Sequence, residues 1–569
     1  MKRVILLIST ACFLVSSHFA FAQPSDEKNF LSMYFSDAEL MVESATRSPE
    51  AVSHVAENMT VVTAADIERM NAHTLADVLN TVPGVQVWTG FNPGQQATVN
   101  ILGAAEPHVT VIMDGVVRNY LWSQFAEVGM IPVQNIEKVE IIKGPASSAW
   151  GSALGGVVNI ITKSGRIADQ GGVLSGSYGT KNFNDLRAEV RGKQDRTGYY
   201  LSAGRLQSNQ LVFDTSASEQ NVYAKLSYDL TNRTDVQLAF DYERTWRDDY
   251  LDLAGDSVGS DLSQHLHSTI TINSAVTNNL DLNISAWMYE QYQDNRAVTI
   301  STGDIFTYKE QNQGNGVRAK LTWKGAQQTI VAGVDADAKT DTIPFIAGGR
   351  QSIRQEAVYL NDTISLDRLT VIPGIRLDHV SANGDITSPS LGLTYGLGNN
   401  TLLRAFVAHG FSVPSPADTS GAAFWLPNPD LKVETVWSYQ AGIESAMKHL
   451  WMKLTLFRSD VKDKIDWVLL GSGDLQVQNV EKERYDILLI EAKTAPVYNT
   501  SLSASAEFIT AKDLETGEHL PQIPVQVYDI GFKYDDRQSF NALLHGRHIT
   551  GTSWIGASRN TTPCFWTLP

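Results

Sequence analysis

Apolar and polar residues alternate along most of the chain after residue 170. Val222, Ala224 and Leu226 form one such series, and residues 280–288 repeat the pattern. A period of two predicts β-strands with one apolar face and one polar face. The apolar face is the core of a soluble β-sandwich, whereas it contacts lipid in an outer-membrane barrel. Alternation alone leaves both architectures open.

The links between these strands alternate in length. Short links with turn-forming residues lie at 231–233, 277–279 and 398–400, and long polar links lie at 208–219, 248–263, 411–433 and 513–522. Short turns on one side and long loops on the other are typical of membrane barrels. The alternating segments predict nineteen strands, the last near residues 539–548.

A different pattern precedes this region. Residues 109–113, 139–142 and 157–161 are short apolar runs rich in β-branched side chains, and each predicts a buried strand. Glycine-rich turns lie between the runs, where glycine permits positive φ and close approach of the backbone. We therefore predict a compact αβ module with its strands inside.

Two short helices are expected upstream of these strands. Thr63 with Asp66, and Thr74 with Asp77, have the spacing of a helix N-cap and its N3 acid. Apolar residues follow each pair, and a Pro-Gly dipeptide at 83–84 ends the second helix. These helices complete the αβ module.

Residues 1–22 have the features of a secretory signal peptide. A positively charged start precedes an apolar run, and Ala20-Phe21-Ala22 forms a small-x-small cleavage site. No later stretch reaches the roughly 18 consecutive apolar residues that a spanning helix requires. We expect an exported chain whose membrane spans are strands. Cys12 leaves with the signal, so Cys564 has no intramolecular disulfide partner.

Composition narrows the function classes. The formal net charge is −17, which argues against nucleic acid as the main partner. There is no H-E-x-x-H, G-x-S-x-G or Walker motif to suggest a hydrolase or a nucleotide site. His265 and His267 share a strand face, and the acidic stretch 248–261 could offer oxygens to calcium, but lumen residues and a solvated loop are the simpler interpretations. We expect no enzyme, cofactor or bound metal.

The glycine-turned module resembles the plug domain of the TonB-dependent outer-membrane receptors. The shared motifs, in order, are Met113-Asp114-Gly115, Ile131-Pro132, residues 136–140, Lys143-Gly144-Pro145, Ala149-Trp150-Gly151 and residues 153–163. This resemblance implies a mostly β fold, in which a transmembrane antiparallel barrel of the 22-stranded type holds the αβ plug in its lumen. The resemblance also favours a membrane barrel over a soluble sandwich for the alternating region after residue 170.

The resemblance implies a domain plan. We expect the signal at 1–22, a flexible segment at 23–48, the plug at 49–165 and the barrel at 166–550. The tail 551–569 does not alternate and closes on a proline, which cannot donate to a ladder. With nineteen of the family's strands present, we expect this tail to reflect a truncation or a shifted reading frame.

One short segment resembles the TonB box, through which the family couples to the periplasmic TonB protein. Its residues are Glu39, Leu40, Met41, Val42, Glu43, Ser44 and Ala45. Such a segment must be able to join the edge of a partner's sheet as an added strand. An ordinary linker is the alternative interpretation. We call residues 39–45 the coupling segment.

Two positions depart from the family pattern. Leu102 stands where the family usually has an arginine, and Lys143 replaces a second arginine. In the family these arginines help pair the plug with barrel glutamates. Leucine cannot make that bond, and lysine offers a point charge rather than a planar fork. We expect altered plug–barrel pairing here.

Ligand contacts are expected on the outward plug loops. The candidates are Phe91, Asn92, Gln95, Gln96, His108, Arg118, Asn119, Tyr120 and Trp122, with Glu106 beside them. Aromatic side chains offer apolar area with a polar handle, and Arg118 can pair with an anionic ligand. Packing of these residues against the barrel is the alternative.

The resemblance implies a monomeric receptor in the bacterial outer membrane, surrounded by lipid, that takes up a scarce ligand with TonB as partner. An iron–siderophore chelate and a cobalamin-like corrinoid both fit. A plugged barrel that binds or adheres without transport is the alternative of a different class, and removal of the coupling segment would leave its function intact. A secreted β-rich hydrolase would be soluble, and the sequence offers it no catalytic set.

Overall fold

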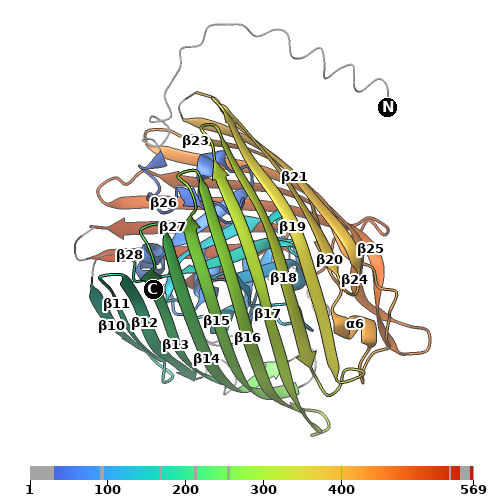
Figure 1. Cartoon of the computed structure of the whole chain (residues 1–569). Helices are drawn as coiled ribbons and strands as arrows, with labels where there is room; N and C mark the ends of the chain where they lie inside the picture. The colour runs from blue at the N-terminus through green and yellow to red at the C-terminus, as the bar shows by residue number, and fades with distance from the viewer. Residues whose placement is uncertain are drawn as a thin grey trace, which may run out of the picture.

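The computed structural model is a β-barrel with a smaller αβ domain inside it (Figure 1). It describes residues 31–89, 95–166, 170–209, 215–252, 257–398, 400–536, 538, 540–551 and 564–567. A single 20-stranded sheet forms the wall, and the inner domain lies within its curve. The predicted mostly β architecture with an N-terminal plug is confirmed.

The wall follows the chain order, each strand pairing antiparallel with the next. Its strands are β10 Gly171–Tyr178, β11 Asn184–Gln194, β12 Thr197–Asn209, β13 Ser216–Asp229, β14 Thr234–Asp252, β15 Ser257–Ala275, β16 Leu280–Thr299, β17 Ile305–Lys324, β18 Gln328–Thr342, β19 Arg350–Leu366, β20 Leu369–Val380, β21 Gly384–Gly396, β22 Thr401–Ser412, β23 Glu434–Ala446, β24 Leu450–Leu469, β25 Leu475–Thr494, β26 Thr500–Asp513, β27 Gln526–Asp535, β28 Asn541–Thr550 and β29 Cys564–Thr567. A short helix, α6 Pro416–Ser420, interrupts the link between β22 and β23.

The predicted strand count holds. β10 to β28 are nineteen strands, and β28 lies close to the predicted last segment. β29 adds a short twentieth strand paired with β28. Within the described residues, β10 pairs with β11 alone. The rest of the tail after residue 551 lies outside the described residues.

Alternation places apolar side chains on the outside of the wall. Val222 and Leu226 are 47% and 44% exposed, whereas Tyr223 of the same strand is 2% exposed and points inward. One expected long link is mostly strand, because β14 runs to Asp252 and β15 begins at Ser257. The β14–β15 register shifts between Arg247 and Tyr250, which interrupts the period-two signal although the ladder continues.

The inner domain contains the predicted plug elements. Its strands are β1 Met41–Val42, β2 Glu50–Ala51, β3 Asn58–Thr63, β4 Val85–Thr89, β5 Ala97–Ile101, β6 Val109–Met113, β7 Val116–Val117, β8 Ile136–Lys143 and β9 Gly156–Thr162, and its helical turns are η1 Val52–His54, α3 Ala64–Arg69, α4 Leu75–Leu79, η2 Glu106–His108, η3 Val128–Met130 and α5 Ser147–Trp150. Five strands form one sheet in the order β3-β8-β9-β6-β7. Thr63 and Asp66 cap α3 reciprocally, as the spacing predicts.

The core joins the plug to the barrel wall. Val111, Val139 and Ile160 from the three predicted strands belong to one buried cluster. Inward side chains of the wall, Tyr223 and Ile487 among them, pack into the same cluster. The wall side of this cluster also carries hydroxyls and charges, so the plug rests on a mixed rather than a purely apolar surface.

None of the helices in the described ranges is long and apolar enough to cross a membrane. Within the same ranges, no group of three or more His, Cys, Asp or Glu side chains is arranged to hold a metal ion. The inward histidines His265 and His267 instead contact the plug, as described below.

Candidate functional site

The barrel has two different ends. Short links such as 230–233 and 276–279 join strands at one end, and longer links such as 413–433 lie at the other. We call them the short-turn end and the long-loop end. The N-terminal segment lies at the short-turn end, where Leu31, Tyr34 and Leu40 pack with wall residues that flank two of the short turns, Ala446, Trp451 and Ala495.

The coupling segment is held on the plug. Met41 and Val42 pair with β2, and Val42 is 1% exposed. Beyond them the backbone N–H groups of Glu43 and Ser44 donate to the Glu140 carboxylate at 3.0 and 2.8 Å. The Ser44 hydroxyl donates to the same carboxylate, whose side chain is fully buried in the middle of β8. Glu140 therefore collects three donors from two consecutive residues.

Further contacts surround this carboxylate. The Lys138 ammonium lies 2.6 Å from Glu140 and donates to the Met41 carbonyl at 2.9 Å. The indole N–H of Trp150 donates to the Ser44 carbonyl at 2.7 Å. From the barrel wall, Lys320 pairs with Glu43 at 3.2 Å. Plug and barrel thus both hold the coupling segment.

This placement differs from the flexible segment expected over residues 23–48. Residues 31–48 pack against the plug and the short-turn end, because their apolar side chains and several donors find buried partners there. Residues 23–30 lie outside the described residues.

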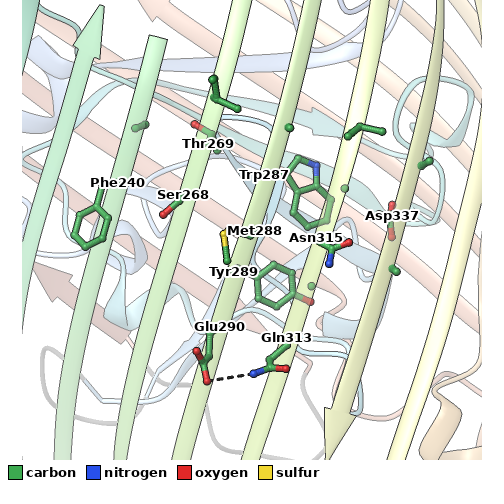
Figure 2. Close-up of a pocket in the computed structure, with 18 of the residues that line it drawn as sticks. Phe240, Ser268, Thr269, Trp287, Met288, Tyr289, Glu290, Gln313, Asn315 and Asp337 are labelled. Carbon is green, nitrogen blue, oxygen red and sulfur yellow. Dashed lines mark hydrogen bonds between the residues drawn. The ribbon is translucent and has the colours of Figure 1, made fainter.

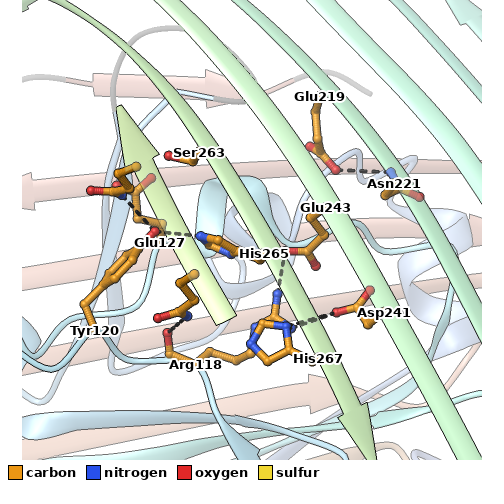
Figure 3. A network of polar contacts seen from close by, with 12 residues as sticks. Arg118, Tyr120, Glu127, Glu219, Asn221, Asp241, Glu243, Ser263, His265 and His267 are labelled. Carbon is orange, nitrogen blue, oxygen red and sulfur yellow. Dashed lines mark hydrogen bonds and ion pairs between the residues drawn. The ribbon is translucent and has the colours of Figure 1, made fainter. Parts of the chain in front are cut away.

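At the opposite end of the plug, the loop after β7 contacts the wall through buried charges (Figure 3). Arg118 is 4% exposed, and its guanidinium donates to Asp241 at 2.7 Å and to Glu243. It also lies 2.8 Å from Nδ1 of His267. Arg118 is therefore already paired with two carboxylates of β14.

Tyr120 continues this network. Its hydroxyl lies 2.7 Å from Nε2 of His265 and accepts a hydrogen bond from Gln293 at 2.8 Å. Nearby, Arg247 of the wall bridges Glu127 of the plug at 2.6 Å and Asp261 at 2.8 Å. Plug and wall share a nearly continuous set of charge-assisted bonds, which are the strong kind in a buried site.

The electrostatics of the two plug residues follow from this burial. Burial alone lowers the pKa of Arg118, but the carboxylates of Glu243 and Asp241 outweigh it, and the resulting pKa lies above the usual value. Burial, reinforced by the negative charge of Glu127, raises the pKa of Tyr120 well above its usual value. Arg118 is thus a cation and Tyr120 a neutral hydroxyl over the physiological range.

The other predicted ligand residues also meet the wall or the plug itself. Nε2 of His108 lies 2.7 Å from Glu434, and the Trp122 indole N–H donates to Glu310 at 2.8 Å. The remaining contacts are Gln95 with the Ser216 carbonyl, and Asn119 with the plug backbone at Val109, Val111 and Gln124. Gln96 is exposed, while Phe91 and Asn92 lie outside the described residues.

The structure thus brings Arg118, Tyr120 and Trp122 together on one loop facing the wall, with His108 at a separate contact. In this state all three contact the wall, and Tyr120 also lines a small hollow together with Asn119 and Gln124. A ligand that reaches them must compete with barrel carboxylates and histidines, and any such displacement would loosen the plug.

Another hollow lies over β13 to β19, with a volume of about 1270 Å³ (Figure 2). Exposed apolar residues that line it include Phe240, Met288 and Val317, at 43%, 63% and 54%. Trp287, from the same strand as Met288, is buried against the plug. The hollow is therefore a groove on the outside of the wall, where a membrane barrel presents apolar side chains to lipid.

A group of aromatic residues at the long-loop end was missed by the sequence analysis. Phe345 is its centre, and the other members from the barrel are Phe306, Tyr308, Phe424, Trp425 and Trp467. We call these six residues the outer aromatic patch. The only local signal was the Phe-Trp pair at 424–425 within a long polar link, because the members come from four separate parts of the sequence.

Family models match nearly the whole chain. The model described as "TonB dependent receptor-like, beta-barrel" matches residues 163–567, and the "TonB-dependent Receptor Plug Domain" matches residues 51–157. The chain belongs to the TonB-dependent receptor family. The family resemblance expected from the plug motifs is thereby confirmed.

Several characterised proteins are similar to this receptor. The vitamin B12 transporter BtuB of Vibrio vulnificus (strain YJ016) is 25% identical over 514 residues, which cover 86% of this chain and 80% of the relative. The ferric enterobactin receptor of Pseudomonas aeruginosa is 25% identical over 526 residues, covering 75% and 70%. The solved siderophore receptor PirA from Acinetobacter baumannii superposes with a TM-score of 0.72 at 18% identity, covering 86% of each chain, and shows the shared fold.

Membership in the TonB-dependent receptor family places the chain in the bacterial outer membrane as a transport receptor rather than an enzyme. Receptors of this family interact with TonB and bind siderophore or corrinoid ligands. The apolar outside of the barrel, including the groove in Figure 2, accordingly faces lipid.

Proposed function

We propose that this receptor takes up a ferric siderophore or a cobalamin-like corrinoid, with residues 39–45 as the strand that TonB engages. The observation that carries the proposal is the position of two plug segments at opposite ends of the barrel. The coupling segment lies at the short-turn end, and the Arg118–Trp122 loop faces the long-loop end. The five-stranded plug sheet connects them, since Glu140 lies on β8 and the Arg118–Trp122 loop follows β7.

The contacts at both ends support a movable plug. The loop is held by paired charges and hydrogen bonds, which a ligand can exchange for its own, rather than by apolar packing alone. The coupling segment is held by donors to Glu140, which a partner strand can replace with ladder bonds. Ligand binding at the long-loop end and the force that TonB applies to the coupling segment then both act on the plug.

The test separates binding from transport. Val42→Pro removes a ladder donor and restricts the preceding residue, so it should abolish energy-dependent uptake of labelled cyanocobalamin or ferric enterobactin. Binding to whole cells should remain, because the neighbours of Val42, Leu40 and Glu43, contact the wall near the short-turn end, away from the outer loops. Val42→Ile is the matched control. Uptake at the wild-type rate in Val42→Pro would exclude residues 39–45 as the coupling strand. Residues 39–45 would also be dispensable if the protein served adhesion rather than transport.

A further inference from the structure

The chain just upstream of the coupling segment is folded rather than extended. Residues 31–38 begin with one backbone turn and continue into a second, in which the Glu39 N–H donates to the Ser36 carbonyl at 3.0 Å and the Leu40 N–H donates to it at 3.2 Å. The Glu39 carboxylate in turn accepts the Ser36 N–H at 2.6 Å and the Ser36 hydroxyl at 2.8 Å. The first two residues of the coupling segment therefore belong to this second turn. We call residues 31–38 the clasp.

Aromatic side chains attach the clasp to the barrel wall at the short-turn end. The Phe35 ring lies 5.1 Å from the Trp451 ring and nearly perpendicular to it, an edge-on contact that stabilises beyond simple burial. Tyr34 is 6% exposed, and its hydroxyl donates to the Met447 carbonyl in the turn between β23 and β24. Trp451 is itself oriented, because its indole N–H donates to Glu444 at 2.9 Å. The clasp therefore lies on an ordered surface of the wall.

A lysine of the wall completes this attachment. The Lys493 ammonium of β25 donates to the Tyr34 carbonyl at 2.7 Å and lies 4.8 Å from the centre of the Phe35 ring. A cation over an aromatic face is attracted by the electron density of the ring. Within the described ranges the clasp adds no strand to the plug sheet or to the wall. Its detachment therefore breaks a few side-chain contacts and no ladder bond.

The coupling segment is consequently restrained on both sides. Upstream, Leu40 packs with the clasp against the wall, and its carbonyl accepts the Val52 N–H at 2.9 Å. Downstream, the Ser44 N–H donates to Glu140 of the plug at 2.8 Å. A strand that joins a partner's sheet must be extended, with its backbone groups free to form ladder bonds. Release from Glu140 alone therefore frees only the downstream part of the segment.

We propose that the clasp is an autoinhibitory element, which keeps the coupling segment from TonB until the clasp detaches from the barrel wall. This regulation concerns the same segment as the proposed function and rests on it. The plug restrains the downstream part of the segment through Glu140, and the wall restrains the upstream part through the clasp. The apparent affinity for TonB falls in proportion to the fraction of molecules in which the segment is released. Weakening the clasp should therefore strengthen TonB binding.

The test measures binding of the periplasmic domain of TonB to the full receptor purified from outer membranes. Phe35→Ser removes both the edge-on contact and the cation–π contact, so TonB binding should tighten by about tenfold. Trp451→Ser should tighten it as well, and the double variant should add little to Phe35→Ser, because the two residues form one contact. Met33→Ser is the matched control in the clasp, since Met33 is 37% exposed. Tyr498→Ser, 94% exposed in a short turn at the same end, controls for loss of an aromatic ring there. Heat-modifiable gel mobility confirms that each barrel is folded.

A clasp that is held closed gives the opposite measurement. Tyr34→Cys with Met447→Cys, in a Cys564→Ser background, places two thiols where the Tyr34 hydroxyl meets the Met447 backbone. A short bifunctional thiol reagent should join them. We expect the joined receptor to bind TonB about tenfold more weakly than the same variant before joining, because the segment can then be released only downstream.

The outcomes separate the clasp from the proposed function. Equal TonB affinity in the wild type, Phe35→Ser and Trp451→Ser would overturn the clasp alone, and so would equal affinity of the joined and unjoined receptor. The same tightening in Met33→Ser as in Phe35→Ser would also overturn it. Adding Val42→Pro to Phe35→Ser should abolish TonB binding. Retained binding in that variant, or no TonB binding in any variant, would overturn residues 39–45 as the coupling strand and the clasp with it.

Discussion

Ser44 directs its backbone N–H at the carboxylate of Glu140, 2.8 Å away, and its hydroxyl donates to the same group. A fully buried carboxylate needs such donors, and here the coupling segment supplies them. The donors are the backbone groups that a partner strand would require. We therefore expect Glu140 to influence how readily this segment leaves the plug.

Replacing Glu140 with Gln should release the coupling segment more often. The amide keeps the shape but loses the charge and one acceptor oxygen, and a hydrogen bond to a charged group contributes about 1.5–3 kcal/mol. We expect the released fraction to rise by about tenfold or more. The measurement is the labelling rate of a buried thiol, Val42→Cys in a Cys564→Ser background. Glu137→Gln, at an exposed position of the same strand, is the control, and equal rates in both variants would contradict the role of Glu140.

Gly156 should not tolerate a side chain. Its φ is +150°, and a Cβ would lie 2.5 Å from the Ile142 carbonyl oxygen. We expect Gly156→Val to destabilise the plug by on the order of 1–3 kcal/mol, because backbone or strand pairing must shift. The measurement is sensitivity of cells to antibiotics that an intact plug excludes. At Gly171 a Cβ would meet nothing within 4 Å, so Gly171→Val is the control. If cells with Gly156→Val were no more sensitive to these antibiotics than wild-type cells, the plug would tolerate the backbone shift without loss of stability.

The fold was predictable because its signals are local. The three plug strands are apolar runs that become β6, β8 and β9, and the wall strands follow from alternation between neighbouring residues. The stretch 248–263 was interpreted wrongly as a long link, because an irregularity in the register between Arg247 and Tyr250 interrupts the alternation.

The contacts of the site were not predictable, because they join residues far apart in the sequence. His108 meets Glu434 and Tyr120 meets His265, yet neither wall residue is near a recognisable motif. Local patterns predict that Arg118 and Trp122 follow a turn after a plug strand, and the structure has them in the loop after β7. Whether that loop lines a cavity or anchors to the wall depends on which barrel side chains face inward at the same height, and this is set by strand register.

The pH dependence of plug stability should reflect Glu57. This residue is 6% exposed, and burial raises its pKa from 4.5 to about 7, with Arg404 and nearby backbone donors opposing. Between pH 4.5 and about 7 the folded plug therefore keeps a proton on Glu57 that the unfolded chain releases. The contribution of this proton to the free energy of unfolding is fully present below the pKa of the unfolded chain, and it is lost as the pH rises through about 7. The total change is on the order of 3 kcal/mol.

Urea unfolding of the plug at pH 5 and pH 8, within an intact barrel, measures this effect. Wild type should be more stable at the lower pH, and Glu57→Gln should flatten the difference because the amide does not titrate. Glu68→Gln, at an exposed position of α3, should retain the wild-type dependence. A wild-type profile that rises from pH 5 to pH 8 would show that other groups dominate.

The family usually has arginines at the positions of Leu102 and Lys143, and in this chain only Lys143 carries a positive charge. It is fully buried, and its ammonium lies 3.8 Å from Glu491 of the wall. Leu102 packs into the apolar core and offers no charge, while Glu507 of the wall is 2% exposed with no hydrogen bond to a described residue. Two buried carboxylates thus depend on few cations.

Lys143→Met should therefore loosen the plug, by about 1–3 kcal/mol, because Glu491 loses one of its cationic partners and keeps Lys453, 4.0 Å away. Lys143→Arg should keep or strengthen the hold, since its planar fork can engage a carboxylate with two bonds. Lys512→Met, at an exposed position of β26, controls for loss of a positive charge. The measurement is urea unfolding of the plug at neutral pH. Equal stability of Lys143→Met and Lys512→Met would mean that Lys143 packs as a neutral side chain and that apolar contacts, not ion pairing, hold this side of the plug.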